Sequence, residues 1–419
     1  MIVKNNIIGV YMKILHLISQ YPSKTGSGIY LSEVYKNLKL KGYEQKVLCS
    51  MNYDDIIKTN FDDIEIIKFN GKDISFPVVG MSDIMPYKTF LFKDLVDDKF
   101  QEYIRVLEKK IRKCIDEFKP DIIFTNHLYI MSAIVGNIKG NIKAFGFCHG
   151  TDLRQLYKND IHKNFILKRI NKLDGIFSLS NIQKNEINKF FKYDLEKIHV
   201  IGGGYDDSFY YKKEDKKFLK NSEIKIIYAG KFSRSKGVIY LLKAFLKLVD
   251  KYNIHLILAG SGTKDEYKEI IEYAKKISPF VTFKGYLPMK EIAQIFRECD
   301  IFAMPSLYEG LSLVTIEAIA CGLRIVTNEL ENLIDFVGKD IISSNFVEIV
   351  KMPKLYDTDK VVKEFENEHI ENWKIALEKQ ILNTINNNHT DPIYNKVKKY
   401  TWKNIVDNIE KIVKNNKSL

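Results

Sequence analysis

Short apolar runs alternate with longer amphipathic stretches along the first half of the chain. Met12–Ile18 has the pattern of a buried strand, and a glycine-containing loop and a helix over about Ile29–Lys41 follow it. A long helical pattern covers Gln101–Glu117, and further apolar runs predict strands at Asp121–Thr125, Ala144–Cys148 and Gly175–Leu179. Short buried strands that alternate with helices are typical of a parallel sheet flanked by helices.

The alternation pauses after Gly202-Gly203-Gly204, and a polar, lysine-rich piece over Tyr210–Ser222 predicts a linker. It then restarts with predicted strands at Ile224–Ala229, His255–Ala259, Val281–Phe283, Ile301–Met304 and Ile325–Thr327. Helices are predicted between them, over Gly237–Tyr252, Asp265–Lys276, Met289–Glu298 and Val314–Cys321. The chain is therefore expected to form two doubly wound α/β units. Because ligands of such sheets bind at the carboxyl ends of the strands, we expect a site in the cleft between the units.

Composition narrows the class of protein. The chain has 419 residues, a length typical of roughly two to three domains, and 45% of the residues are hydrophobic. Lys and Arg number 65 against 53 Asp and Glu, and the resulting net charge of +12 indicates either an anionic partner or only a biased residue usage. No nucleic-acid-binding motif accompanies this charge, so nucleic acid is disfavoured as the partner.

Cysteine usage and hydropathy bear on the compartment. Five widely spaced cysteines without a C-x-x-C pair argue against a disulfide framework and favour a reducing cytoplasm; they are Cys49, Cys114, Cys148, Cys299 and Cys321. No run reaches the ~20 apolar residues that a membrane-spanning helix needs. The first residues lack the apolar core of a secretion signal, and Met12 is an alternative start to Met1.

The most informative segment follows the strand Ile301–Met304. Pro305-Ser306 end the strand, a loop carries Glu309 and Gly310, and a helix starts near Leu313 and holds Glu317. Free backbone N–H groups at a helix start form an anion site that suits a diphosphate. Two acids on either side of such a site make sense if Glu309 faces a transferred sugar and Glu317 the ribose of a nucleotide.

The E-x7-E spacing of Glu309 and Glu317 resembles the signature of the retaining glycosyltransferases of family 4, which have the GT-B fold of two Rossmann-like domains facing across a cleft. Gly230-Lys231 followed by Lys236-Gly237 is similar to the family's G-R-x-x-x-x-K-G stretch, with Lys231 where the family usually has Arg. The resemblance implies that both lysines neutralise the diphosphate. Lys lacks the bidentate fork of Arg, and Arg234 is a candidate to compensate.

Further motifs extend the resemblance. Leu256–Gly262 is similar to the family's strand and glycine turn, and Phe283–Leu287 to the loop that contacts the nucleobase. His199–Phe209 resembles the join between the domains, although Gly-Gly replaces Pro-Asn. The implied catalytic residues are Glu309, His149, Lys236 and Lys231. The implied donor-binding residues are Gly26, Ser27, Gly28, Gly230, Arg234, Tyr286, Leu287, Gly310, Leu311, Ser312, Leu313 and Glu317.

Several residues in the first half have two interpretations. Gly26-Ser27-Gly28 matches a glycine-rich loop near the donor phosphates or is a plain turn. His149-Gly-Thr-Asp152 matches the family's H-G-x-D, yet His149 could be a buried core histidine and Asp152 a helix cap. Asn126 and His127 end a strand and, with Asp152, are weak candidates for the acceptor side.

The resemblance also implies a division of the chain. Residues 1–205 would form the acceptor domain, joined by a returning C-terminal helix at 396–419 that Tyr400-Thr401-Trp402 introduces, and residues 206–395 the sugar-nucleotide domain. Residues 338–395 match the family poorly.

Metal and membrane contacts are secondary possibilities. Asp357 and Asp359 have D-x-D spacing, but they lie in a weakly patterned stretch, and the resemblance implies neither a metal nor another cofactor. The basic amphipathic stretch Lys163–Leu173 could contact an anionic membrane at its inner face, or it is a core-packed helix with a solvated basic side.

The predicted function is retaining transfer of a sugar from a nucleotide-diphosphate sugar, with UDP favoured, to a hydroxyl acceptor in glycan, glycolipid or glycoside synthesis. A sugar-nucleotide epimerase of the same fold is the main alternative. A Rossmann oxidoreductase is weaker because no complete G-x-G-x-x-G follows a strand. A non-catalytic sugar-binding protein fits less well with the set of Glu and Lys residues.

Overall fold

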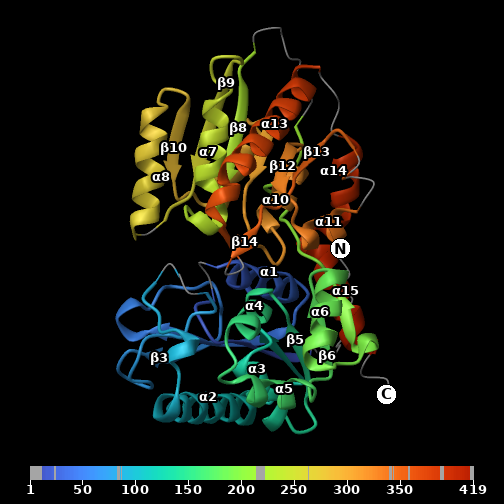
Figure 1. Ribbon diagram of the computed structural model, residues 1–419. Coiled ribbons are helices and arrows are strands. Elements are labelled where there is room, and N and C mark those ends of the chain that lie inside the picture. The colour runs from blue at the N-terminus through green and yellow to red at the C-terminus, as the bar shows by residue number, and fades with distance from the viewer. Residues whose placement is uncertain are drawn as a thin grey trace, which may run out of the picture. The chain divides into compact units, whose positions relative to one another are not determined.

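The computed structural model describes residues 12–415 except 23–24, 83–84, 86, 214–221, 263, 339–341, 343, 357–358 and 387–390. The chain forms two compact units (Figure 1), and each is described by itself. The first unit ends at Ile201 and also includes the chain from Val406 on, and the second runs from Gly202 to Ile405.

The first unit is built on a seven-stranded parallel sheet in the order β3-β2-β1-β4-β5-β6-β7. Its strands are β1 (Lys13–Ile18), β2 (Glu44–Asn52), β3 (Ile64–Phe69), β4 (Ile122–Asn126), β5 (Lys143–Phe147), β6 (Gly175–Ser178) and β7 (Ile198–Val200). Its helices are α1 (Gly26–Leu40), α2 (Asp97–Phe118), α3 (Ile130–Ile138), α4 (Thr151–Lys158), α5 (Lys163–Ile170), α6 (Asn181–Phe191) and most of α15 (Trp402–Asn415). Helix α3 packs against both α2 and α5 (Figure 1).

The second unit holds a six-stranded parallel sheet in the order β10-β9-β8-β11-β12-β13. The strands are β8 (Ile224–Ala229), β9 (Ile254–Ala259), β10 (Val281–Gly285), β11 (Ile301–Met304), β12 (Arg324–Asn328) and β13 (Val347–Val350), and β14 (Leu355–Tyr356) pairs with β15 (Lys360–Val361) outside the sheet. The helices are α7 (Val238–Leu246), α8 (Lys264–Lys276), α9 (Met289–Phe296), α10 (Leu313–Ala320), α11 (Glu331–Val337), α13 (Glu366–Ile385) and α14 (Asp391–Val397). Helix α13 packs on α7 and on β13 (Figure 1).

Both sheets have a switch point where the strand order reverses. It lies between β1 and β4 in the first unit and between β8 and β11 in the second. Loops that leave neighbouring strands in opposite directions open a crevice at the carboxyl ends, where α/β proteins bind ligands. The loop after β8 carries Lys231 and Lys236, and the loop after β11 carries Glu309, so this topology positions the predicted donor residues.

The predicted fold class is confirmed: both units are doubly wound parallel sheets with helices. The strands β2, β3, β7 and β13 were not predicted. Strand β2 has a mixed pattern because buried polar groups interrupt its apolar residues, among them Gln45, which bonds the His16 ring at 2.9 Å. Helix α7 ends at Leu246 and not near Tyr252, since the residues that follow form turns.

The chain leaves the first unit at Ile201, ahead of the predicted boundary at 205 and the predicted linker at Tyr210–Ser222. Packing explains the difference. The Tyr205 N–H donates to the Tyr400 carbonyl at 3.1 Å, and the Trp402 N–H donates to the Tyr205 carbonyl at 3.0 Å. Because this short parallel pairing holds both segments in the second unit, that unit also takes the start of α15. Residues 214–221 of the predicted linker lie outside the described residues.

Candidate active site

Lys236 and Glu309 form an ion pair in the second unit. The Lys236 Nζ lies 2.5 Å from Glu309 Oε1, and the two side chains are 26% and 17% exposed. Lys236 ends the short 3-10 turn after β8, and Glu309 lies in the loop after β11. A cation and a carboxylate at neighbouring strand ends, both partly open to solvent, offer opposite charges to a ligand at the switch point.

The two loops are held together by their backbones. Gly237 has φ 65°, and a Cβ there would stand 2.0 Å from the Pro305 carbonyl oxygen, so the position requires glycine. The Leu307 N–H donates to the Ser235 carbonyl at 3.0 Å. In the Lys236-Gly237 motif the glycine thus has a steric reason, and the lysine has a chemical one.

A buried amide supports the loop after β11 from below. Asn328, at the end of β12, donates from Nδ2 to the carbonyls of Pro305 at 2.8 Å and Ser306 at 3.0 Å. Its Oδ1 accepts from the Trp373 indole N–H of α13 at 2.8 Å, and both side chains are fully buried. Neither residue could be predicted as functional from the sequence, because no local motif joins positions so far apart in the chain.

Lys231 lies on a loop fixed by Tyr228. The Tyr228 hydroxyl donates to the Lys231 carbonyl at 2.6 Å, and burial together with the charge of Glu309 raises the pKa of Tyr228. The neighbouring turn depends on Gly260, whose φ is 137° and where a Cβ would stand 1.8 Å from the Gly230 carbonyl oxygen. These contacts hold the Gly230-Lys231 backbone beside the end of β9.

Arg234, the candidate to compensate for the lysine at position 231, is paired with a carboxylate in this structure. Its guanidinium pairs with Glu269 of α8 at 2.8 Å, and the side chain is 61% exposed. Its own backbone N–H donates to Glu266 at 3.2 Å. Arg234 is therefore engaged with α8, and among the described residues no hydrogen bond or ion pair joins it to Lys236 or Glu309.

The predicted nucleobase loop lies at the end of β10. The Gly260 N–H donates to the Gly285 carbonyl at 2.7 Å, which ties this loop to the end of β9. Tyr286 follows and is 80% exposed, and Leu287 is partly exposed. An aromatic ring with this much free surface gains from covering by a planar ligand.

Helix α10 starts at Leu313, where the sequence predicts it, and Ser312 is its N-cap. The Ser312 side chain makes no capping bond to the helix backbone; its Oγ accepts from the Thr315 hydroxyl at 2.8 Å. Gly310 is partly exposed and Leu311 is buried. The first turn of α10 therefore keeps backbone N–H groups available for an anion.

Glu317, one turn further along α10, interacts with the buried Tyr210. Burial raises the pKa of Tyr210, and the hydrogen bond to Glu317 and the charge of that carboxylate raise it further. The sequence pattern at Tyr210 predicts a linker and gives no indication of this contact. Glu317 is consequently an oriented carboxylate and not a freely solvated one.

His149 belongs to a cluster of polar side chains in the first unit. Its Nε2 lies 2.9 Å from Asn126 Oδ1, and its ring lies 4.9 Å from the ring of His127 and 5.4 Å from that of Tyr30. Burial lowers the pKa of His149 to about 3, and burial and the neighbouring His149 also lower the pKa of His127. Both imidazoles are therefore neutral at physiological pH.

Asp152 is held by hydrogen bonds from the backbone of its own unit. The carboxylate is fully buried and accepts from the backbone N–H groups of Leu128 at 2.8 Å and His149 at 3.3 Å. Burial raises its pKa, against the opposing effect of these hydrogen bonds. This geometry gives Asp152 a structural role, because its carboxylate joins the segments that follow β4 and β5.

Gly26, Ser27 and Gly28 lie in the first turn of α1 and not in a loop ahead of it. The Thr25 side chain caps the helix by accepting from the Gly28 N–H at 3.1 Å, a signal that the sequence analysis overlooked. Ser27 Oγ accepts from the buried Gln20 amide at 3.0 Å, and the same amide lies 3.4 Å from His127 Nε2. The glycines are thus at a helix N-terminus, beside the histidine cluster.

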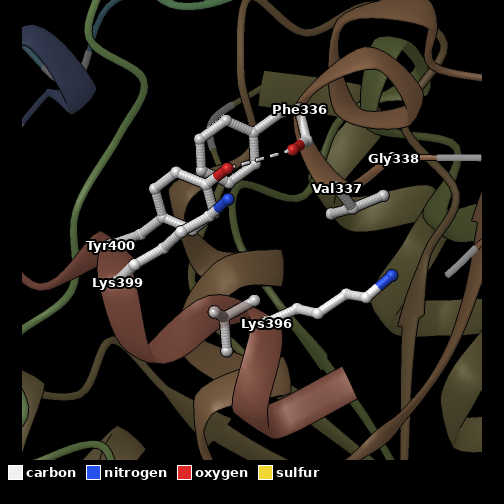
Figure 2. A pocket seen from close by; sticks show the side chains of 7 residues that line it. Phe336, Val337, Gly338, Lys396, Lys399 and Tyr400 are labelled. Atoms are coloured by element: carbon white, nitrogen blue, oxygen red, sulfur yellow. Dashed lines mark hydrogen bonds between the residues drawn. The ribbon is translucent and has the colours of Figure 1, made fainter. Parts of the chain in front are cut away.

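A cavity of about 320 Å³ lies elsewhere in the second unit, between α11 and the segment from Lys396 to Tyr400. Figure 2 shows its lining, where the Tyr400 ring lies tilted against that of Phe336 with 4.1 Å between the ring centroids. None of the predicted catalytic or donor residues lines it. The cavity and the candidate site are separate features.

Neither a metal site nor a membrane span is found in the described part of the chain. No group of three or more His, Cys, Asp or Glu side chains there is arranged to hold a metal ion, and Asp357 of the D-x-D pair lies outside the described residues. No described helix is long and apolar enough to span a membrane. On α5, the side chains of Ile166 and Ile170 are buried in the core. The guanidinium carbon of Arg169 lies 3.9 Å from the centroid of the Phe165 ring.

Comparison with known proteins gives concordant results. The model for "Glycosyltransferase Family 4" matches residues 25–209, and the model for "Glycosyl transferases group 1" matches residues 211–347. The N-acetyl-alpha-D-glucosaminyl L-malate synthase of Bacillus anthracis is 24% identical over 75% of this chain and 78% of its own.

Two solved structures share the fold. Sucrose-phosphate synthase from Thermosynechococcus elongatus aligns with a TM-score of 0.73 at 15% identity, covering 96% of this chain and 98% of its own. The Anabaena protein HepE, in complex with UDP and glucose, aligns with a TM-score of 0.63 at 16% identity, covering 97% and 100%. Since the two family models together span most of the sequence, and the fold is the one their members share, the chain belongs to the GT-B glycosyltransferases of the family 4 type.

Proposed function

We propose that this glycosyltransferase moves a sugar from a nucleoside diphosphate sugar, with UDP as the nucleotide, to a hydroxyl acceptor and retains the anomeric configuration. The observation that carries the proposal is the Lys236–Glu309 pair, 2.5 Å apart at the switch point of the second unit. The cation suits a diphosphate, and the carboxylate suits the hydroxyls of the sugar attached to it. The complex of HepE with UDP and glucose supports this choice of donor.

Bond breaking leaves negative charge on the departing diphosphate. In the proposed reaction Lys236, Lys231 and the free N–H groups at the start of α10 stabilise that charge where it develops. Glu309 orients the sugar hydroxyls and is not a covalent nucleophile. The neutral His149 contacts the donor sugar, and Glu317 holds the ribose while Tyr210 fixes the orientation of its carboxylate.

We further propose that transfer needs no resident metal. Lysine charges and the α10 dipole supply the neutralisation that a divalent cation provides in other sugar-nucleotide enzymes. Treatment with a chelator should leave the rate unchanged. Inhibition that Mn²⁺ reverses would contradict this and would direct attention to Asp357 and Asp359.

The first test is a donor screen by thermal shift on the full chain, with UDP, GDP and ADP sugars and the free nucleotides. A true donor raises the midpoint temperature of thermal unfolding because it binds only the folded state. Lys236→Ala should lose most of the UDP-sugar shift, whereas Lys290→Ala, on the solvated side of α9, should keep it. Equal shifts in wild type and Lys236→Ala would refute the diphosphate role.

Product analysis separates the remaining alternatives. NMR of the product with a saccharide or small hydroxyl acceptor should show the anomeric configuration of the donor. An epimerised donor in the absence of acceptor would identify a sugar-nucleotide epimerase instead. The lipid acceptor and anionic membrane surface considered for Lys163–Leu173 can be tested by adding anionic vesicles to the same assay.

A further inference from the structure

Asn126 determines which nitrogen of His149 carries the proton. The Asn126 amide is oriented by a partner that can only accept: its Nδ2 donates to the Leu17 carbonyl at 3.2 Å. With the NH₂ group committed to that carbonyl, the amide oxygen is the atom that faces His149 Nε2 at 2.9 Å. A carbonyl oxygen accepts and cannot donate, so the His149 Nε2 must bear a hydrogen.

We propose that Asn126 is a positioning residue that holds His149 as the neutral Nε2–H tautomer and leaves Nδ1 as a hydrogen-bond acceptor for a substrate hydroxyl. Within the described part of the chain no group bonds to His149 Nδ1. A bare lone pair attracts an O–H group and repels a phosphate oxygen. The substrate partner of His149 is then a sugar hydroxyl and not the diphosphate, a deduction that rests on the proposed function.

The surroundings of His149 keep this arrangement fixed. Its backbone N–H is held by Asp152 Oδ2 at 3.3 Å, and its ring packs against Tyr30 at 5.4 Å and His127 at 4.9 Å. Asp152, Tyr30 and His127 are titratable groups of the described part of the unit that contact His149, and burial keeps Tyr30 and His127 uncharged. Burial also lowers the pKa of His149 to about 3, so the ring does not gain a second proton above that pH.

The direct test is nitrogen NMR of the full chain labelled with [¹⁵N]histidine, with His149→Gln to assign the signals. The wild type should show His149 Nε2 as the protonated, pyrrole-like nitrogen and Nδ1 as the unprotonated, pyridine-like one. A protonated Nδ1, or rapid exchange between the two forms, would overturn the proposal. Because the spectrum needs no substrate, its result is independent of whether the proposed transfer is observed.

Two substitutions connect the tautomer to turnover. Asn126→Leu removes the acceptor, so the proton should exchange between Nε2 and Nδ1 and no longer stay on Nε2, with a fall in kcat/KM of roughly 10- to 100-fold. Asn126→Asp keeps an oxygen against Nε2, and its charge should raise the pKa of His149. That variant should keep the wild-type tautomer but lose activity as the pH falls through the raised pKa, an acid limb that the wild type lacks.

Asn52→Leu is the matched control. Asn52 is another buried strand-end asparagine of the same sheet, whose amide bonds the backbone of Val78 and Lys88 at 2.9 and 2.8 Å. Its loss should lower stability and leave the His149 nitrogen signals unchanged. If Asn126→Leu behaves in the same way, or Asn126→Asp follows the wild-type pH profile, Asn126 is merely structural and the proposal fails.

Discussion

Gly237 and Pro305 approach so closely that any side chain at position 237 would overlap the Pro305 carbonyl. A Cβ would stand 2.0 Å from that oxygen, and the backbone φ of 65° is one that only glycine adopts without strain. This contact locks the loop after β8 onto the loop after β11. It thereby sets the distance between Lys236 and Glu309.

Gly237→Ala should therefore destabilise the protein by about 2–4 kcal/mol and impair transfer. Gly140→Ala is the control, because Gly140 also has a positive φ of 57° but has nothing within 4 Å of its Cβ position. The control should therefore lose only the stability that backbone strain costs, about 1 kcal/mol. Chemical denaturation of both variants measures the difference, and equal losses would show that the contact with Pro305 is unimportant.

Glu309→Gln should abolish most turnover while leaving the fold intact. The amide keeps the size of the side chain but loses the charge that pairs with Lys236 and grips the sugar hydroxyls. We expect kcat to fall about 10²- to 10³-fold, the range for loss of one preorganised electrostatic group. Steady-state kinetics and a melting curve on the same sample check this. Wild-type turnover in Glu309→Gln would rule out the assigned site.

Lys231→Arg should keep or raise activity. The bond from Tyr228 goes to the Lys231 carbonyl, so a new side chain leaves the loop backbone in place. Arg would offer the diphosphate two parallel N–H groups in place of one ammonium. Lys231→Met, similar in length but uncharged, is the comparison and should lower kcat/KM. A complete loss of activity in Lys231→Arg would assign another task to this position.

Local motifs explain why the second-unit site could be predicted. Lys236-Gly237 and the Glu309…Glu317 pair lie at strand-to-helix junctions that hydropathy alone marks, and the structure has α10 starting at Leu313 as expected. The pairing of Lys236 with Glu309 then follows from the neighbouring positions of β8 and β11 at the switch point. Sequence pattern and topology here convey the same information.

Long-range polar contacts could not be predicted in this way. Gln20, Tyr210, Asn328 and Trp373 are buried and act through partners that are distant in the sequence or in another element, so no spacing identifies them. The same holds for Arg234. Its sequence position makes it a candidate phosphate ligand, and its pairing with Glu269 of α8, more than thirty residues on, is a contact that no spacing indicates.

Trp373→Phe tests the support beneath the Glu309 loop. The substitution leaves Asn328 Oδ1 buried without its donor, which should cost about 1–3 kcal/mol of unfolding free energy. Because Asn328 also bonds the Pro305 and Ser306 carbonyls, kcat should fall as well. A double-mutant cycle with Asn328→Ala measures the coupling free energy between the two side chains. Strictly additive effects would show that the two side chains do not act together.

His369 should make stability depend on pH in the mildly acidic range. The ring, on α13, is buried beside Tyr240 at 5.3 Å, and neither nitrogen has a hydrogen-bond partner among the described residues. Burial lowers its pKa from 6.5 to about 4. Below pH 6.5 the unfolded chain takes up a proton that the folded protein refuses, so stability falls as the pH drops and levels off near pH 4.

Between pH 6.5 and 4 this one group should lower the free energy of unfolding by on the order of 2–4 kcal/mol. His369→Phe fills the same apolar site without a titratable ring and should make the pH dependence between 6.5 and 4 shallower by the share of this one group, while the other buried histidines keep theirs. His199→Phe is the control, since His199 is only partly buried, although burial lowers its pKa as well. Urea denaturation across the range measures both variants. If His369→Phe retained the wild-type slope, the acid sensitivity would have to arise from other buried histidines, with His16 the first to examine, because burial lowers its pKa to about 4 as well.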